Sequence, residues 1–401
     1  ARGGHGVRDW DGGMNGHRPE TPERRSGVRE FERSVVPGTT EPPNARTVER
    51  SSSLSVPPWR TGVGPLTRRI WREYGSLLGL VLIGAALSLL SDRFLTTSNL
   101  INVARQVSIN AIVAAGMTVV VITGGIDLSV GSTIALAGCA ALLVAGPTGD
   151  LVGMVEGIVV GGLVGLLNGA LVAWGRVPPF ITTLATMTIV RGAALVLTNG
   201  EPIVKAQGAY LWLGQASIGP LPVPILVMVA VLLGTHWFLA RTRWGIYVYA
   251  VGGNAEAARL VGISLAGVQI LVYVLGGVLA ALAGLVLAAR LSSAQLNTGV
   301  GFELDAIAAV VLGGTSLMGG EGGIWGTTVG AFIIGILNNG FNLLNVSPFY
   351  QLIAKGAVIV LAVLVDQVLK AGAASTGGEP TAPHPQSVAD AGPAGERPRD
   401  G

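Results

Sequence analysis

Side-chain amides are the groups best placed to carry chemistry in this chain. Asn338, Asn342 and Asn345 follow one another at spacings of four and three residues, so one face of a helix would carry all three, with Asn339 beside them. Amides bind hydroxyl groups without requiring a charge on the solute. Because an amide in hydrocarbon must be paired or face a cavity, the row predicts either the lining of a path for a neutral solute or hydrogen bonds between helices.

A short internal repeat connects this row to a fifth amide. The letters GLLNG at 165–169 lead to VPPF at 177–180, and GILNN at 335–339 leads to VSPF at 346–349. The offset of about 170 residues contains an odd number of predicted crossings, which would invert the second copy, as in many transporters with a site at the membrane midplane. Asn168 then corresponds to Asn338 and extends the lining from the other half, unless the similarity arose by chance.

The segment 252–263, GGNAEAARLVGI, is the best candidate for a short helix outside the membrane. Asn254 can accept a bond from a free amide of the first turn, and Gly262 supplies a stop. Glu256 and Arg259 carry the charges that a helix dipole favours at the start and at the end. Long apolar segments flank this helix on both sides. The segment therefore predicts a docking helix on the cytoplasmic side of a membrane, with an ordinary loop helix as the alternative.

The docking surface itself follows from helical spacing. Ala257, Leu260 and Val261 share one face, opposite Glu256 and Arg259. Ser264 can cap the next helix. The residues assigned to the docking helix are Gly253, Asn254, Glu256, Ala257, Ala258, Arg259, Leu260, Val261 and Gly262.

Ionisable side chains inside the apolar region have simpler interpretations. Asp127 follows a pair of glycines and precedes an apolar run, so we expect it to cap a helix rather than to transfer protons. Glu303 and Asp305 suit the N-terminus of a helix. Lys355 is expected either to reach the membrane interface or to pair with a carboxylate.

Several kinds of chemistry are excluded. The run 313–323, GGTSLMGGEGG, resembles a phosphate-binding loop in composition, but such a loop ends in Gly-Lys-Ser/Thr and no lysine of this chain follows a glycine. The single cysteine, Cys139, excludes an intrachain disulfide and a site with several thiolates. We therefore expect no enzyme activity, no metal and no cofactor bound by this chain.

Composition places the chain among membrane proteins. Half of its 401 residues are hydrophobic and 12% are charged, whereas soluble domains carry about 25% charged residues. The charges concentrate at the two ends, so we expect disordered cytoplasmic tails at 1–73 and 370–401 around a transmembrane domain at 74–369. The net charge of +3 does not indicate a nucleic-acid partner.

The expected fold is all-α and polytopic, with about ten transmembrane helices and an inverted repeat. Arginines before the first span, and basic residues after the fourth, sixth and tenth, favour a cytoplasmic location for both tails, although Arg93 and Arg105 fall on the outer side. The long outer loop near 199–221 is a candidate contact for an external partner. The expected spans are 74–91, 106–124, 128–146, 151–173, 180–198, 222–240, 266–289, 303–318, 323–343 and 349–369.

Small residues at helical spacing predict close packing between helices rather than a binding site. One stripe contains Gly157, Gly161, Gly165, Asn168 and Gly169, and another contains Gln269, Tyr273, Gly276, Ala280 and Gly284.

Longer motifs resemble a known family. They are ELDAIAAVVLGGTSLMGGEGG from Glu303, ILNNG at 336–340, LAVLVD ending at Asp366, GGIDLSVGS at 124–132, VPPFITTL at 177–184 and GGNAEAARLVGI at 252–263. Together they are similar to the permease subunit of ribose-type sugar ATP-binding cassette (ABC) importers, a family that also includes xylose and other monosaccharide permeases. The resemblance covers residues 90–369 in the right order, and the N-terminal tail departs from it.

The resemblance implies the partners. A homodimer of permeases would bind two ATP-binding subunits, or one fused tandem ATPase, with ATP and Mg²⁺ held by those subunits. An external solute-binding protein would deliver a neutral monosaccharide such as ribose or xylose, and residues 252–263 would include the coupling helix. The location implied is the bacterial cytoplasmic membrane. Related permeases also carry branched-chain amino acids, so a non-sugar solute stays open.

A self-sufficient secondary transporter or channel is the main alternative. Carriers coupled to protons or sodium usually expose carboxylates within the membrane, and here such acids are scarce, with Glu156 the main exception. The docking helix and the missing phosphate-binding loop both favour a subunit that depends on a separate ATPase. A membrane scaffold or receptor is disfavoured because neither tail contains a folded domain.

Overall fold

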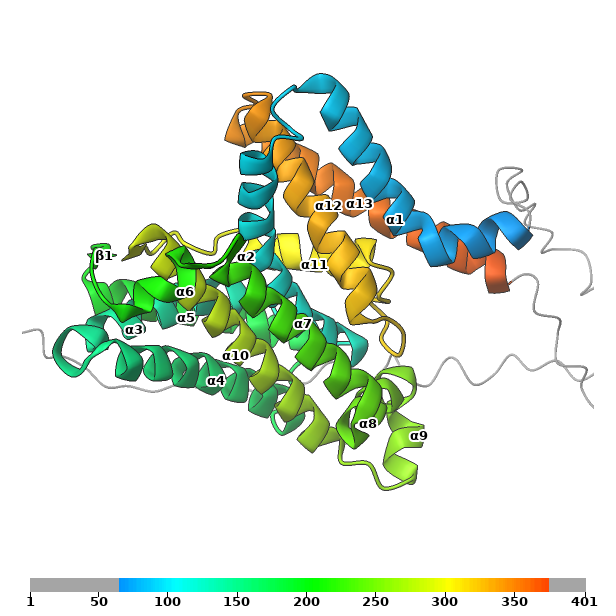
Figure 1. Ribbon diagram of the computed structural model, residues 1–401. Helices are drawn as coiled ribbons and strands as arrows, with labels where there is room; N and C mark the ends of the chain where they lie inside the picture. The colour runs from blue at the N-terminus through cyan, green and yellow to red at the C-terminus, as the bar shows by residue number, and fades with distance from the viewer. Residues whose placement is uncertain (1–64, 375–401) are drawn as a thin grey trace, which may run out of the picture. The chain divides into compact units, whose positions relative to one another are not determined.

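The structure is a computed structural model that describes residues 65–374 and is almost entirely helical, as expected (Figure 1). The tails at 1–64 and 375–401 lie outside the described residues. The long helices are α1 (Pro65–Leu90), α2 (Thr97–Ile122), α3 (Val130–Thr148), α4 (Asp150–Ala173), α5 (Pro179–Thr198), α7 (Val223–Arg241), α10 (Leu265–Leu291), α12 (Ile324–Leu343) and α13 (Pro348–Ala374). The shorter ones are η2 (Ala209–Leu211), α6 (Trp212–Gln215), α8 (Arg243–Gly253), α9 (Ala255–Leu260) and α11 (Phe302–Leu312).

Each predicted span coincides with a helix, although several bounds differ. Among the described residues, six helices are long and apolar enough to cross a membrane, namely α2, α4, α5, α7, α10 and α12, and 75–90 and 130–146 form shorter apolar helices. The first helix begins at Pro65 rather than at Tyr74, and the last continues to Ala374, so both predicted tail boundaries fall inside helices.

The predicted span 303–318 is wrong in length. Its helix, α11, ends at Leu312 after 11 residues, which cover about 16 Å, or roughly half of the hydrocarbon core. The glycine-rich segment 313–323 follows. Gly314, Gly319, Gly320 and Gly322 all have positive φ values there, a conformation that glycine adopts readily and that stops the helix.

The centre of the fold is α2. Its residues from Val107 to Ile122 are all buried, because this stretch is apolar around its whole circumference and packs against α7, α10, α11 and α12. Figure 1 shows α2 crossing behind α7 and α10, with α12 beside it.

Small residues hold the closest helix pair, α4 and α10. A Cβ added at Gly161 would lie 2.4 Å from the carbonyl oxygen of Gly277, and one at Gly165 would lie 2.2 Å from that of Tyr273. The predicted packing role of both stripes is therefore confirmed. The second stripe, however, contributes to three interfaces, since Gly276 faces Gly116 of α2 and Gly284 faces Ile134 of α3.

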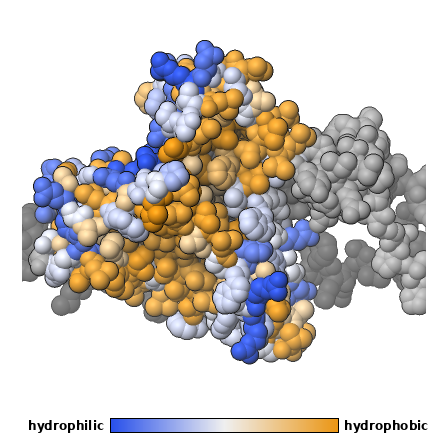
Figure 2. All heavy atoms as spheres, in the orientation of Figure 1, coloured by the Kyte–Doolittle hydropathy of each residue, from blue (hydrophilic) through white to orange (hydrophobic). Residues whose placement is uncertain are grey.

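Apolar side chains cover much of the outside. On α4, Leu151, Val155, Val159 and Leu163 are exposed at a spacing of four residues, the pattern of a helix that faces lipid. Figure 2 shows apolar surface spread over the region of α7 and α10, with polar residues gathered towards α8 and α9.

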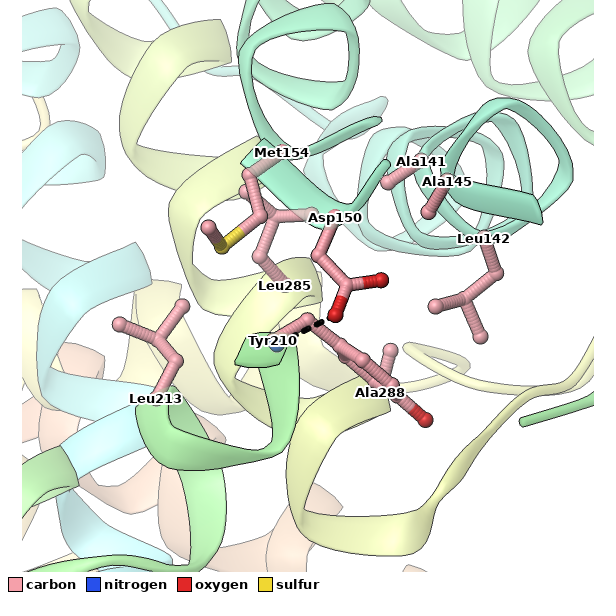
Figure 3. Close-up of a pocket in the computed structure, with 9 residues that line it drawn as sticks. All are labelled: Ala141, Leu142, Ala145, Asp150, Met154, Tyr210, Leu213, Leu285 and Ala288. Atoms are coloured by element: carbon pink, nitrogen blue, oxygen red, sulfur yellow. Dashed lines mark hydrogen bonds between the residues drawn. The ribbon is translucent and has the colours of Figure 1, made fainter. Parts of the chain in front are cut away.

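The loop at 199–222 is folded onto the helix ends. Strand β1 (Ile203–Val204) pairs with β4 (Ser293–Ala294), and β2 (Ser217–Ile218) pairs with β3 (Leu221–Pro222), both antiparallel. Lys205 forms an ion pair with Asp150 at the start of α4. Asp150 also accepts the backbone N–H of Tyr210, 3.2 Å away, in the close-up of Figure 3. The cavity beside this contact measures about 10 Å³, which is too small for a solute.

The two repeat corners share their local backbone. Arg176, between α4 and α5, has φ 54°, and Asn345, between α12 and α13, has φ 53°. Each corner then leads to a proline at the first position of the next helix, Pro179 or Pro348. This similarity supports the repeat at the level of the corners.

Candidate functional site

The predicted docking helix exists, but it is shorter than expected. Asn254 accepts the N–H of Ala257 at 2.9 Å and caps α9, and Gly262 follows it with φ 86°. Ser264 accepts the N–H of Gly267 at 3.2 Å and caps α10, as expected. Gly253 is not part of α9, because it ends the preceding helix α8.

Helix α8 was missed by the sequence interpretation. The sequence feature that could have predicted α8 is Thr242, which precedes a short apolar run. Its hydroxyl accepts the N–H of Gly245 at 3.1 Å and caps the helix. Eleven residues are too few for a transmembrane span, so a search for spans passes over this helix.

The packing of α9 leaves its predicted apolar face uncovered by the described residues. Ala258 is its only buried residue, whereas Leu260 and Val261 are 78% and 77% exposed. Glu256 and Arg259 form an exposed ion pair of 2.6 Å, which contributes about 0.2–1 kcal/mol to stability. Helix α9 thus presents two large apolar side chains and a charge pair that the described residues leave uncovered.

Glycines join α8 to the centre of the fold. A Cβ at Gly252 would lie 1.8 Å from the carbonyl oxygen of Ile122 and 2.6 Å from the amide of Gly320. That amide donates to Ile122 at 2.8 Å, and the Tyr249 hydroxyl donates to the carbonyl of Gly322 at 2.9 Å. The ends of α2 and α8 therefore contact the glycine segment that precedes α12.

The asparagine row does not form one continuous face. Helix α12 ends at Leu343, and Asn345 lies in the turn beyond it, so the expected continuation of the face to Asn345 is wrong. Asn339 is buried and exchanges hydrogen bonds with Asn99 of α2 at 3.0 and 2.9 Å. This pair is the interhelical bonding that the sequence left open.

Asn338 and Asn342 lie in a polar seam between α11, α12 and α13. Lys355 forms an ion pair of 3.0 Å with Asp305, so the alternative of pairing with a carboxylate is confirmed. Asn338 donates to the same carboxylate at 3.4 Å, and Gln351 donates to Asn342 at 3.0 Å. The buried Oδ1 of Asn338 has no hydrogen-bond partner among the described residues.

Asn168 lies in a different network. It is fully buried and donates to the Ser129 hydroxyl at 2.8 Å, which in turn donates to Asp127 at 2.6 Å. Asp127 also accepts the Ser129 N–H at 2.9 Å, just before α3. The expected capping by Asp127 is wrong, because the residue before α3 is Ser129, and Asp127 forms a turn with Ser129 instead of accepting an N–H group of the helix. Asn168 packs α4 against the start of α3, and the structure does not bring it to the asparagines of α12.

The sequence of this chain matches a known family of membrane permeases. Residues 99–363 match the family described as "Branched-chain amino acid transport system / permease component". The chain belongs to this permease family. No solved structure matches it.

Relatives of this permease are similar over most of their length. The ribose import permease protein RbsC of Escherichia coli strain K12 is 49% identical over 299 residues, 73% of this chain and 93% of the relative. RbsC of Bacillus subtilis strain 168 is 47% identical over 302 residues, 74% and 94% of the two chains. The L-arabinose transport system permease protein AraH of Escherichia coli strain K12 is 39% identical over 300 residues, 75% and 92%. The family match at 99–363 begins after α1 and ends within α13.

Proposed function

We propose that this permease is the membrane subunit of an ABC importer for a neutral monosaccharide, with D-ribose the first candidate. The observation that carries the proposal is the near full-length similarity to permeases named for ribose and L-arabinose. The family description names branched-chain amino acids, so leucine is the competing solute to test. ATP and Mg²⁺ would be held by the ATPase partners.

Helix α9 would dock in a groove of the ATPase. Leu260 ends this six-residue helix and Val261 follows it, and both side chains are exposed. Asn254 caps the helix, and Gly262 ends its last turn. Such a helix would stay folded when the ATPase moves it. Leu260 and Val261 would supply the buried apolar contact that anchors an interface. The Glu256–Arg259 pair beside it would set the orientation of docking.

A movement of α9 would be transmitted to the solute path along α12 through the backbone contacts of Gly252 and Gly320. The ends of α8 and α2 touch the segment 313–323 at Gly252, Ile122 and Gly320, and α12 begins directly after that segment. Because these backbones touch without intervening side chains, a displacement of α8 displaces the start of α12. Asn338 and Asn342 on α12 would then line a path that opens and closes.

The partners follow from this orientation. The end that carries α8 and α9 would be cytoplasmic, as would both tails, and the loop at 199–222 would face the external binding protein. Its internal ion pair and two small strand pairs give that protein a folded surface. A second copy of the permease would complete the path.

The test is uptake by purified components. Proteoliposomes should contain this permease with its ATPase, and the binding protein should be added outside with radiolabelled D-ribose. We expect uptake that requires ATP and is reduced by excess L-arabinose or D-allose less than by unlabelled D-ribose. Uptake of labelled leucine with no uptake of any of the three sugars would overturn the sugar assignment.

A charge reversal tests the docking helix. The double variant Glu256→Arg/Arg259→Glu keeps a pair of opposite charges on α9 but reverses their order. The reversal opposes the helix dipole at a cost of about 0.3–1 kcal/mol at each end, which is small enough for the complex to fold. We expect uptake to fall about tenfold while ATP hydrolysis persists, since losing one buried interface contact of about 1.4 kcal/mol has that effect. Unchanged uptake would remove α9 from the coupling route.

A further inference from the structure

A second cavity lies next to the α8 contact. It measures about 360 Å³, within the range of about 300–1,000 Å³ found for small-molecule sites. The last turns of α7, the side chain of Tyr249 on α8, and the backbone around the glycine segment and the start of α12 form its walls.

Two aromatic rings define one side of the cavity. His236 and Trp325 stand with ring centroids 5.3 Å apart and planes tilted by 53°. Trp325 is 59% exposed, although it is the second residue of α12 and sits at a cavity wall. An exposed indole at such a wall offers an apolar plane and an N–H donor together.

Another part of the cavity lining is the backbone of glycines. A Cβ at Gly326 would lie 2.0 Å from the carbonyl oxygen of Gly313, and one at Gly322 would lie 2.4 Å from the Thr315 side chain. These glycines are required because the ends of α11 and α12 touch there. The first N–H groups of α12, at Ile324 to Gly326, have no partner within the helix and no side-chain cap, so they are the wall's donors for hydroxyl groups.

The chemistry of the walls selects the class of ligand. Among the residues that line the cavity there is no aspartate, glutamate, lysine or arginine, so the site offers no fixed charge to a carboxylate, a phosphate or an ammonium group. An apolar ring plane combined with peptide donors and acceptors suits a neutral polyhydroxyl compound, whose C–H face can lie on the indole while its hydroxyls bond to the backbone.

We infer that this cavity is an exit-side binding site for the transported monosaccharide, a step that rests on the proposed function. It would hold the sugar at the end of the path that carries α8 and α9. The Tyr249–Gly322 hydrogen bond joins its wall to α8. Docking of the ATPase and occupancy of the cavity therefore act on the same contact.

The test uses the full chain with its ATPase in nanodiscs, without the binding protein. Ligand-observed saturation-transfer NMR with D-ribose should give a signal that corresponds to weak binding. Trp325→Leu should raise the apparent Kd at least about fivefold, the effect of losing roughly 40 Å² of apolar contact. Trp237→Leu is the matched control, because Trp237 is 62% exposed on the same helix as His236 and does not line the cavity; its Kd should stay unchanged.

Other outcomes are equally decisive. No ribose signal from wild-type complex that takes up ribose normally would overturn the exit site and leave the proposed function intact. Equal loss of signal in both tryptophan variants would also overturn it, because the effect would not be specific to the cavity. Size-exclusion profiles and thermal midpoints confirm that each variant is folded. Absence of sugar uptake in the assembled wild-type complex would instead count against the proposed function.

Discussion

Four asparagines near the end of α12 have the same side chain but different structural roles. Asn338, Asn339, Asn342 and Asn345 lie within eight positions of one another. Asn339 is buried against Asn99, Asn345 shapes a turn, and only Asn338 and Asn342 belong to the seam with Asp305, Gln351 and Lys355. What each amide does depends on the helix that faces it.

Leucine substitutions at adjacent positions separate path from packing. We expect Asn338→Leu to lower uptake per folded complex about two- to twelvefold, because it removes an amide whose hydrogen bonds are worth about 0.5–1.5 kcal/mol each. Asn339→Leu removes both hydrogen bonds to the part-buried Asn99, which keeps its bond to the carbonyl of Phe94. We expect a cost of about 1–3 kcal/mol of stability for these two bonds, while turnover per folded complex is kept. Uptake and thermal midpoint should be measured on the same preparations. Full turnover in Asn338→Leu would make Asn338 a packing residue.

At the scale of elements, glycine sets which helices can approach closely. Helices α4 and α10 meet along Gly161 and Gly165, with backbone carbonyls close to each glycine. Without a hydrophobic drive between helices in lipid, such close packing is what holds a membrane bundle together. Glycine also allows close backbone contact where Gly252 of α8 meets Ile122 of α2 and Gly320 of the glycine segment.

Two neighbouring glycines provide a matched test of this packing. A Cβ at Gly161 would lie 2.4 Å from the Cβ of Ala281, whereas one at Gly162 would meet only Val278, at 3.4 Å. We expect Gly161→Ala to destabilise the permease by about 1–3 kcal/mol through overpacking. Gly162→Ala should be neutral, or stabilising by up to about 1 kcal/mol through helix propensity. Thermal midpoints in one detergent compare the two, and equal midpoints would refute close packing at Gly161.

At the scale of the whole molecule, polar features gather at two places along the chain. The loop at 199–222 forms one, with strand pairs and the Asp150–Lys205 pair, and the α8–α9 segment with the glycine contacts forms the other. The proposed importer requires these to lie on opposite sides of the membrane.

Cysteine labelling tests that requirement. Ala209 and Ala255 are both exposed, and Cys139 is buried, so Ala209→Cys and Ala255→Cys can each be placed in a Cys139→Ala background. We expect an impermeant thiol reagent to label position 209 from outside intact cells and position 255 only after the membrane is opened. Labelling of both from outside would refute the proposed orientation.

The sequence by itself determined the features that act within a few residues. Hydropathy predicted the long helices, although it missed α8 and overestimated the length of α11. Asn254 predicted the cap of α9, because caps and apolar runs depend on near neighbours. Small-residue spacing predicted that α4 and α10 pack closely, but not that they pack against each other. The resemblance to sugar permeases was also present in contiguous motifs, and the relatives confirm it.

Only the tertiary structure decided which distant residues meet. Asp305 lies 50 positions from Lys355 and Asn99 lies 240 from Asn339, and no local pattern records such pairs. The contact of Gly252 with Ile122 likewise follows from how α8 packs on α2, and the exposure of Leu260 follows from how α9 packs beside α8 and α10. Helical spacing assigns residues to a face, but what covers that face depends on the packing of helices far apart in the chain.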